Sequence, residues 1–222
     1  MTSNKIATFC FTTFLFVAIA TSPANALLVT GEAMIIPAPP SAAHMQLESS
    51  EHAFVWVEQM EVVRGGTTAV SVIPFKNNPS GFYDSGNPAI ENQWAGDLGP
   101  GVYDSYFFHA DKQGAAETFT GTITVPADIV GIVYRQPWLN DTDPIFGAPG
   151  TIYADGPNRF YELDGAQNWF EISMDLRTLS FQTVVLHNMD DLRIITKHVP
   201  EPSACGLVLL GCLGLLRRRQ SC

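Results

Sequence analysis

Apolar and polar residues alternate along much of this chain with a period of two, the pattern of half-buried β-strands. In Phe119–Val125 the apolar residues and Gly121 share one face, and the threonines share the other. The segment 170–177 alternates as regularly, with apolar residues at even positions and polar residues at odd positions. Each segment is therefore predicted to be an antiparallel strand with one face in the core and one in solvent.

Two neighbouring segments are predicted to form a hairpin. Residues 54–63 and 67–73 are rich in β-branched and aromatic side chains, and Gly65 and Gly66 lie between them. Glycine accepts the positive φ that tight hairpin turns require. Further strands are expected at 103–109, 129–135, 160–163, 179–186 and 192–197.

These strands are joined by segments rich in Gly, Pro, Asn and Asp, and no part of the body shows a convincing amphipathic helix. The pattern predicts an all-β fold, an antiparallel β-sandwich of jelly-roll type. A closed barrel is the second choice. Residues 74–100 are the longest irregular stretch, and loops of that length are usually functional or mobile.

The N-terminus has the layout of a secretory signal peptide. Lys5 precedes an apolar run over 6–20, Pro23 follows it, and Ala24 and Ala26 form an A-x-A site. Residues 1–26 are therefore predicted to be removed by cleavage after Ala26. A retained anchor is the alternative, but 15 apolar residues are short for a membrane-spanning helix of about 20 residues.

The C-terminus carries three elements in order. Pro200, Glu201 and Pro202 come first, an apolar run over 204–216 follows, and the run ends at three arginines, Arg217, Arg218 and Arg219. The 13 apolar residues span roughly 20 Å as a helix, which is short of the ~30 Å hydrocarbon core. The prolines disfavour helix before the run, and the arginines are expected to stay on the cytoplasmic side. An ordinary short anchor or an apolar helix packed on the domain are the alternatives.

This order of elements resembles the PEP-CTERM sorting signal, which bacterial exosortases recognise on exported proteins. The resemblance implies as partners the secretion machinery and an exosortase. It also implies transient insertion in the inner membrane, followed by release to the cell surface or extracellular matrix of a bacterium that makes exopolysaccharide. Residues 104–196 are more loosely similar to the β-sandwich bodies of such substrates, and this second resemblance implies no catalytic residues.

Subtracting both signals leaves a predicted domain over 27–198 and a sorting tail over 199–222. The 174 residues from Leu27 to Pro200 are enough for one domain with a sizeable core. This body holds 8 basic and 21 acidic residues, a formal charge of −13, which argues against nucleic acid as a partner. All the cysteines lie in the two signals, so the domain is expected to fold without disulfides.

Catalytic motifs are lacking in the sequence. It has no nucleophile elbow, zinc helix, Walker loop or dinucleotide fingerprint. The nearest acid–base pair is His109 with Asp111, two residues apart and hence on one face of a strand. A salt-linked histidine at a strand end explains the pair equally well. We therefore expect a protein that is not an enzyme.

Two sets of side chains are candidates for a binding site. Asp141, Asp143, Asp190 and Asp191 lie in acidic segments, and calcium takes carboxylate, amide and carbonyl oxygens. The alternative is that Asp and Asn simply stabilise turns through bonds to nearby backbone. Trp94 and Trp138 lie in expected loops beside polar residues, where an indole ring can stack on a sugar, although most tryptophans close a core.

Three functions remain open from the sequence. The first is a non-enzymatic surface or matrix protein with a structural or adhesive body, delivered by exosortase sorting and in contact with exopolysaccharide. The second is a carbohydrate-binding module, which predicts an exposed line of aromatic rings. The third is a secreted hydrolase without a recognisable motif, which predicts two carboxylates or a His–Asp pair converging in a pocket.

Overall fold

A computed structural model describes residues 26–156, 159–165, 167–186 and 189–200. Residues 1–25 of the predicted signal peptide (1–26) and residues 201–222 of the predicted sorting tail (199–222) lie outside the described residues. Within the described ranges, no helix has the length and apolar content needed to cross a membrane. The described strands are, in order, β1 Leu28–Gly31, β2 Ala33–Ile35, β3 Ser41–Ala42, β4 Ala53–Arg64, β5 Thr68–Val70, β6 Phe82–Tyr83, β7 Gly96–Leu98, β8 Gly101–Ala110, β9 Glu117–Thr124, β10 Ile129–Val133, β11 Ile152–Tyr153, β12 Trp169–Ile172, β13 Thr178–Val185 and β14 Asp190–Lys197.

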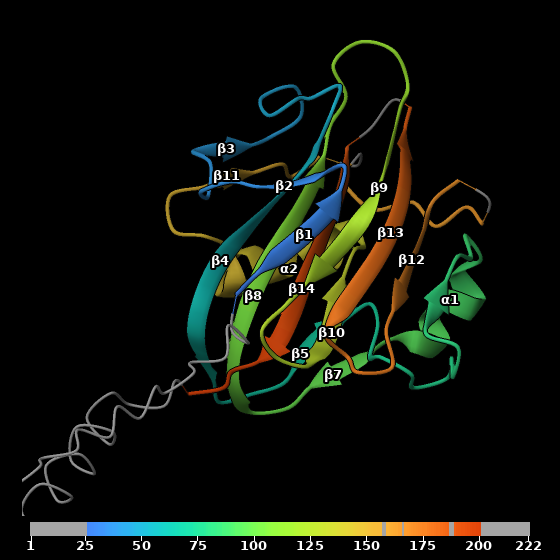
Figure 1. The fold of residues 1–222 in the computed structure, drawn as a ribbon. Helices are drawn as coiled ribbons and strands as arrows, with labels where there is room; N and C mark the ends of the chain where they lie inside the picture. The colour runs from blue at the N-terminus through green and yellow to red at the C-terminus, as the bar shows by residue number, and fades with distance from the viewer. Residues whose placement is uncertain (1–25, 157–158, 166, 187–188, 201–222) are drawn as a thin grey trace, which may run out of the picture.

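The strands form two five-stranded sheets that pack face to face, so the predicted all-β fold is confirmed (Figure 1). The first sheet has the order β1-β9-β13-β12-β6, and the second has the order β10-β14-β8-β4-β2. Pairing within the sheets is antiparallel except at one edge, where β2 runs parallel to β4. A small parallel pair, β3 with β11, lies outside the two main sheets. The jelly-roll type stays a prediction.

The core between the sheets is built from aromatic side chains. Phe108 of β8 meets Phe181 of β13 with ring centroids 4.7 Å apart. Phe170 of β12 stacks on Tyr83 of β6 at 5.0 Å. In β13 every second residue is buried, as the period of two predicts, so the first sheet turns its other face toward solvent.

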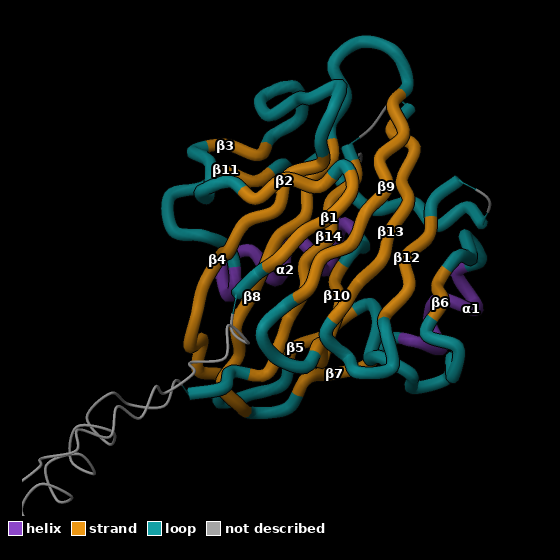
Figure 2. Tube along the Cα trace, in the orientation of Figure 1, coloured by secondary structure: helices purple, strands orange, loops and turns teal. Residues whose placement is uncertain are grey.

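The second sheet differs because it is covered on both faces. All residues of β8 from Tyr103 onward are buried, and so is all of β14 except its last residue. The outer face of this sheet carries Trp56, Phe107 and Ile195, which form a second apolar cluster with Leu139 and Phe146. Leu139 and Phe146 belong to helix α2, so α2 forms part of a third layer over the second sheet (Figure 2).

The expectation that the body has no helix is wrong. Helix α1 spans Pro88–Trp94 and α2 spans Gln136–Phe146. Asn87 caps α1 by accepting a hydrogen bond from the Ala89 amide at 3.0 Å, and Pro88 starts the helix. Both helices are short and one has Pro144 inside it, so neither displays a long apolar period in the sequence.

Three strand predictions also need correction. The predicted hairpin is wrong because β5 pairs with β7 and not with β4. The strand expected over 170–177 ends at Ile172, and the chain then turns through Leu176, whose φ is 61°. The segment 160–163 forms no strand in the part of the chain that is described. The local sequence pattern in these segments thus did not determine the strand partner or the point where the strand ends.

We predict that Phe170→Ala lowers the free energy of unfolding by about 3–5 kcal/mol, since the ring is fully buried among Tyr83, Tyr134 and Tyr161. Met174→Ala is the matched control, because that side chain is 79% exposed, and it should change the free energy by less than about 0.5 kcal/mol. Urea titration followed by tryptophan fluorescence measures both. Equal losses in the two variants would contradict the described core.

Candidate functional site

A network of buried charges lies between the second sheet and α2. Its centre is Arg193 of β14, whose side chain is fully buried. Arg193 donates two hydrogen bonds to the Glu58 carboxylate, from Nε and from Nη2, each at 2.7 Å. Its Nη2 also donates to Asp143 Oδ1 of α2 at 2.8 Å. This one arginine therefore ties β4, β14 and α2 together through charge-assisted hydrogen bonds.

A second buried arginine extends the network. Arg159 donates from Nη2 to Asp143 Oδ1 at 2.9 Å and from Nε to Asp191 Oδ2 at 2.9 Å. The other oxygen of Asp191 lies 2.7 Å from His109 Nδ1. Asp143 and Asp191 are thus brought close together by the Arg159 guanidinium group between them.

Two aromatic rings line the arginines. The Arg159 guanidinium carbon lies 5.5 Å from the Phe107 ring centre and 5.1 Å from the Tyr153 ring centre. The Arg193 guanidinium carbon lies 5.2 Å from the Phe107 ring centre and 5.6 Å from the Tyr153 ring centre. These distances are within the range of cation–π attraction. The Tyr153 hydroxyl donates to Glu58 Oε1 at 2.6 Å. Burial, followed by the Glu58 carboxylate, raises the pKa of Tyr153, so the phenol stays protonated.

This arrangement argues against calcium at the four predicted aspartates. Asp143 and Asp191 already pair with arginine, and Asp141 is exposed on α2. Asp190 points toward the first sheet, where it accepts a hydrogen bond from the Thr183 hydroxyl, and burial raises its pKa well above the usual value. Among the described residues, no group of three or more His, Cys, Asp or Glu is placed to hold a metal ion.

The His109–Asp111 pair does not form an acid–base site. His109 is fully buried and bonds Asp191, and its Nε2 has no hydrogen-bond partner in the described residues. Asp111 is also buried, and it accepts a hydrogen bond from the Met45 amide at 2.7 Å. The two side chains therefore bond different partners, and both are buried.

The predicted tryptophan pair does not form a stacking strip. Trp94 belongs to α1 and is only 5% exposed, because its ring packs edge-on against Tyr83 with centroids 4.9 Å apart. Trp138 belongs to α2 and is partly exposed, but the Arg135 guanidinium lies over its ring at 5.6 Å. The predicted loop setting is thus wrong for both residues, and Trp94 is a core residue.

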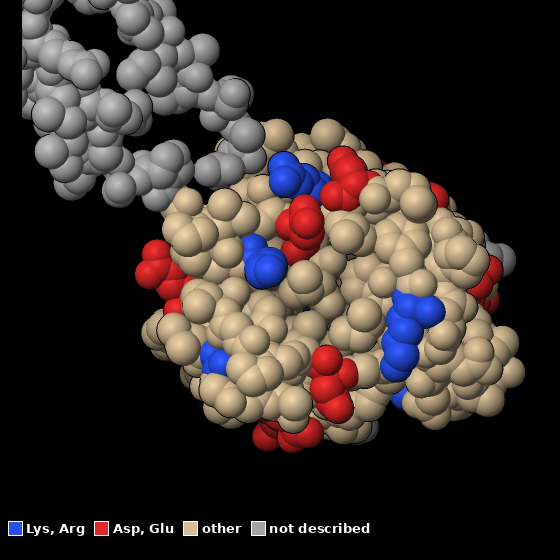
Figure 3. Space-filling view, turned by 90° about the horizontal axis from the view of Figure 1, so that it is seen from below, with Lys and Arg blue, Asp and Glu red and all other residues tan. Residues whose placement is uncertain are grey.

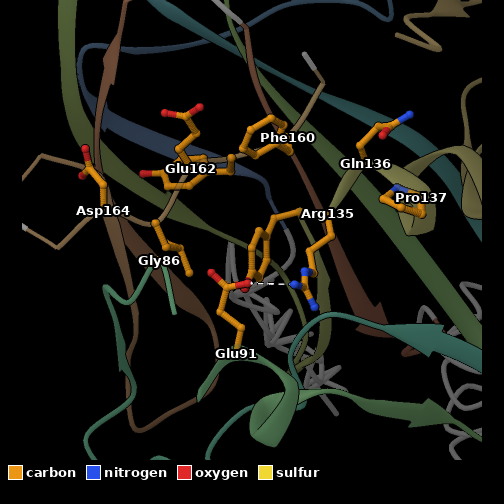
Figure 4. A pocket seen from close by; sticks show the side chains of 11 residues that line it. Gly86, Glu91, Arg135, Gln136, Pro137, Phe160, Glu162 and Asp164 are labelled. Atoms are coloured by element: carbon orange, nitrogen blue, oxygen red, sulfur yellow. Dashed lines mark ion pairs between the residues drawn. The ribbon is translucent and has the colours of Figure 1, made fainter. Parts of the chain in front are cut away.

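The described residues also form a cavity of about 460 Å³. Three segments enclose it, namely α1 with the loop before it, the junction of β10 with α2, and residues 160–164 (Figure 4). The cavity is lined by Gly86, Glu91, Tyr134, Arg135, Gln136, Pro137, Phe160, Tyr161, Glu162, Leu163 and Asp164. It lies outside the charge network, since none of the arginines or carboxylates of that network line it.

One ion pair spans part of the cavity wall. Glu91 accepts a contact from Arg135 Nη2 at 3.2 Å, and Arg135 Nη1 donates to Asn92 Oδ1 at 2.7 Å. Glu91 is 8% exposed, and burial raises its pKa while Arg135 acts in the opposite direction. Burial raises the pKa of Tyr134 as well, and the nearby Glu91 carboxylate adds to that shift. The pair fixes the position of α1 relative to the start of α2.

The sequence did not single out Glu58, Arg159 and Arg193, which hold the buried network. Two of them leave a weak signal, since Glu58 follows the apolar run 53–57 and Arg193 lies between Leu192 and Ile194 in predicted strands. Arg159 lies outside the predicted strands and leaves none. The cavity residues were equally hidden, because they come from segments far apart in the chain.

We predict that Arg193→Met lowers the free energy of unfolding by about 3–5 kcal/mol, because it leaves Glu58 buried without its counter-charge. Arg177→Met removes an arginine whose pair with Asp128 is about half exposed, and should cost less than about 1 kcal/mol. Chemical denaturation of both variants gives the comparison. Similar small losses in both would show that the buried network does not stabilise the fold.

We predict that the contribution of Asp190 to the stability of the fold depends on pH. Its pKa is raised in the folded state, so the folded chain holds a proton that the unfolded chain releases above about pH 4. Stability from this group is therefore present at low pH and is lost as pH rises toward the folded-state pKa. Asp190→Asn should remove that loss, so the variant gains on the wild type between pH 4 and 7. Denaturation midpoints of the variant and the wild type across this pH range test the prediction. A difference between the two midpoints that does not change with pH would contradict it.

In comparisons with known proteins, no family model, curated protein or solved structure matches this chain. The functional conclusion therefore depends on its sequence and on the geometry described above.

Proposed function

We propose that this chain is an exported, exosortase-processed surface or extracellular-matrix protein whose β-sandwich body is displayed and does not catalyse a reaction. The observation that carries the proposal is the order of elements that follows the domain, namely Pro200-Glu201-Pro202, the apolar run over 204–216 and the arginines at 217–219. A signal peptide over 1–26 is the matching element at the other end.

The place where the folded domain ends supports this proposal. Strand β14 ends at Lys197, and the His198 amide donates to the Val102 carbonyl at 3.0 Å. The His198 ring also bonds Asp104 at 2.9 Å, whereas Val199 is 53% exposed. The last described strand thus ends before the Pro-Glu-Pro motif, so a processing enzyme can reach exposed Pro200 without unfolding a strand.

The positions of the two chain ends also support it. The chain enters β1 and runs on from β14 on the same side of the sandwich in Figure 1. Both sheets are built from strands that lie within 28–197, so removing the two signals deletes no described strand. A body anchored near residue 200 would present the opposite end, and both of its sides, to the surroundings.

The charge distribution fits a displayed protein better than a nucleic-acid binder. On the end from which the chain leaves, acidic and basic side chains lie scattered among other residues, without a continuous basic area (Figure 3). The most basic groups of the interior, Arg159 and Arg193, are neutralised by carboxylates. The hydrolase alternative loses its His109–Asp111 pair, and the carbohydrate-binding alternative loses Trp94.

We predict that the mature protein isolated from its host lacks residues 1–26 and the chain beyond the region of Pro200. Replacing both prolines, Pro200→Ala with Pro202→Ala, should leave the tail uncut while the signal peptide is still removed, because the extended motif is lost. Intact-mass spectrometry reads both ends of the chain. Pro149→Ala, in an exposed loop, is the control and should be processed normally. A wild-type protein that still ends at Cys222 would contradict the proposal.

A further inference from the structure

Exposed apolar side chains surround the point where the chain leaves the domain. Val63 of β4 and Val102 of β8 lie opposite each other, and both are exposed, Val63 to 75%. The Val102 carbonyl accepts the His198 amide, so exposed Val199 lies beside this pair. Met60, which is 51% exposed, lines the same hollow as Val199. We call Met60, Val63, Val102 and Val199 the apolar rim.

The rim borders a hollow between the ends of the two sheets. Pro126 and Ala127, which follow β9 of the first sheet, form one side of it. Residues 60–61 of β4, Asp104 of β8 and residues 198–199 form the other side. The hollow has a volume of about 220 Å³, which is below the range of small-molecule sites, about 300–1,000 Å³. The rim is therefore a surface for contact and not a ligand pocket.

The polar side chains of the hollow bond one another. His198 Nδ1 lies 2.9 Å from Asp104 Oδ1, and His198 Nε2 lies 3.5 Å from Glu61 Oε1. Asp104 Oδ1 also accepts a hydrogen bond from the Glu61 amide at 2.8 Å. These groups have partners inside the domain, so the rim offers apolar surface to its surroundings. Exposed apolar patches bordered by polar residues mark contacts with another protein or with a membrane.

The backbone of β4 argues against a second copy that adds to this edge as a strand. Beyond Val55 no described strand pairs with the free edge of β4. The pairing of β4 with β8 shifts register on both sides of Gln59, and Glu61 has a positive φ of 58°. Bulges of this kind interrupt the regular ladder of hydrogen bonds that an added strand needs.

The sequence beyond the domain indicates what the rim faces. The apolar run begins at Ala204, and the four residues from Pro200 reach at most about 14 Å when fully extended. Once this run is inserted in a bilayer, the end of the domain lies within that distance of the hydrocarbon core. The headgroup layer on each side of the core is about 5–8 Å thick. The rim is thus held at the headgroup layer.

The apolar run is also too short to span the bilayer alone. Its 13 residues cover roughly 20 Å of a hydrocarbon core of ~30 Å. A short hydrophobic segment needs compensation, from a thinner bilayer or from flanking groups that enter the interface. The rim supplies such groups directly before the run.

We propose that the apolar rim rests on the lipid bilayer while the tail is inserted, and that its side chains complete an anchor that is too short by itself. This inference rests on the proposed export and transient anchoring, and it adds the surface of the domain that meets the membrane. Apolar side chains at the boundary of headgroups and acyl chains gain free energy by leaving water. Charged side chains on this end are scattered (Figure 3), so the contact is apolar and persists on neutral lipid at high salt.

The first test asks which end of the domain meets lipid. Residues 27–222 keep every described strand and are the form left after the proposed signal cleavage. They are reconstituted in phosphatidylcholine nanodiscs that carry a nitroxide on the lipid headgroup. The methyl NMR signal of Met60 should be broadened. The signal of Met45, which is also exposed, should stay sharp, because the Met45 amide bonds Asp111 beyond the far end of β8.

The outcomes separate this inference from the proposed function. A protein that enters the nanodiscs while Met60 stays sharp has a domain that stands away from the bilayer, so the inference fails and the proposed anchoring stands. A sharp Met60 signal in a protein that sediments as a dimer assigns the rim to a second copy and also overturns the inference. A protein that does not associate with lipid contradicts both the inference and the anchoring.

The second test removes rim side chains from the same form of the chain. Met60→Gln with Val63→Asn should weaken partition into neutral vesicles, measured by flotation, by roughly 10- to 100-fold, because two apolar side chains lose their contact. Met45→Gln with Leu186→Asn is the matched control, because it removes two exposed apolar side chains from the far end, where β13 ends at Val185. The control should partition as the wild type does. Circular dichroism checks that each variant is folded, and equal partition of all three proteins would refute the proposal.

Discussion

Burial of the second sheet on both faces is the constraint on which the rest of this structure depends. A strand that is buried on both sides cannot place its charged residues in water, so Glu58, Asp191 and Arg193 must find partners inside the protein. They do so through Asp143 of α2 and through Arg159. The third layer is therefore held by paired charges as well as by apolar contact.

This constraint explains how the domain is held together without disulfides. No cysteine lies between residues 27 and 198, so the domain depends on its core and on its internal ion pairs. The arginines connect β4, β14 and α2, which are distant in sequence. The network pairs its arginines with carboxylates inside the protein, and none of these residues lines the cavity beside α1.

Strands were predictable where apolar and polar residues alternate and only one face of the strand is buried, as in β9 and β13. Prediction failed where another force decided the structure. Asp and Asn favour turns, so the aspartates near residue 141 were assigned to a turn. In the structure Asp143 lies in α2, where ion pairs with Arg159 and Arg193 stabilise it. Trp94 looked exposed because the packing of α1 on Tyr83 leaves no local signal. The cavity needs residues 86, 135 and 162 together, and only the fold brings them there.

The central claim is that the third layer and the second sheet form one cooperative unit through the buried arginines. Native-state hydrogen exchange measures this directly, because it gives the free energy of opening for each amide. We predict that amides of α2 such as Leu139 and Phe146 open with nearly the same free energy as those of β14 such as Ile194. If the α2 amides exchange with an opening free energy several kcal/mol lower while β14 stays protected, the layer is an independent cover and the account is contradicted.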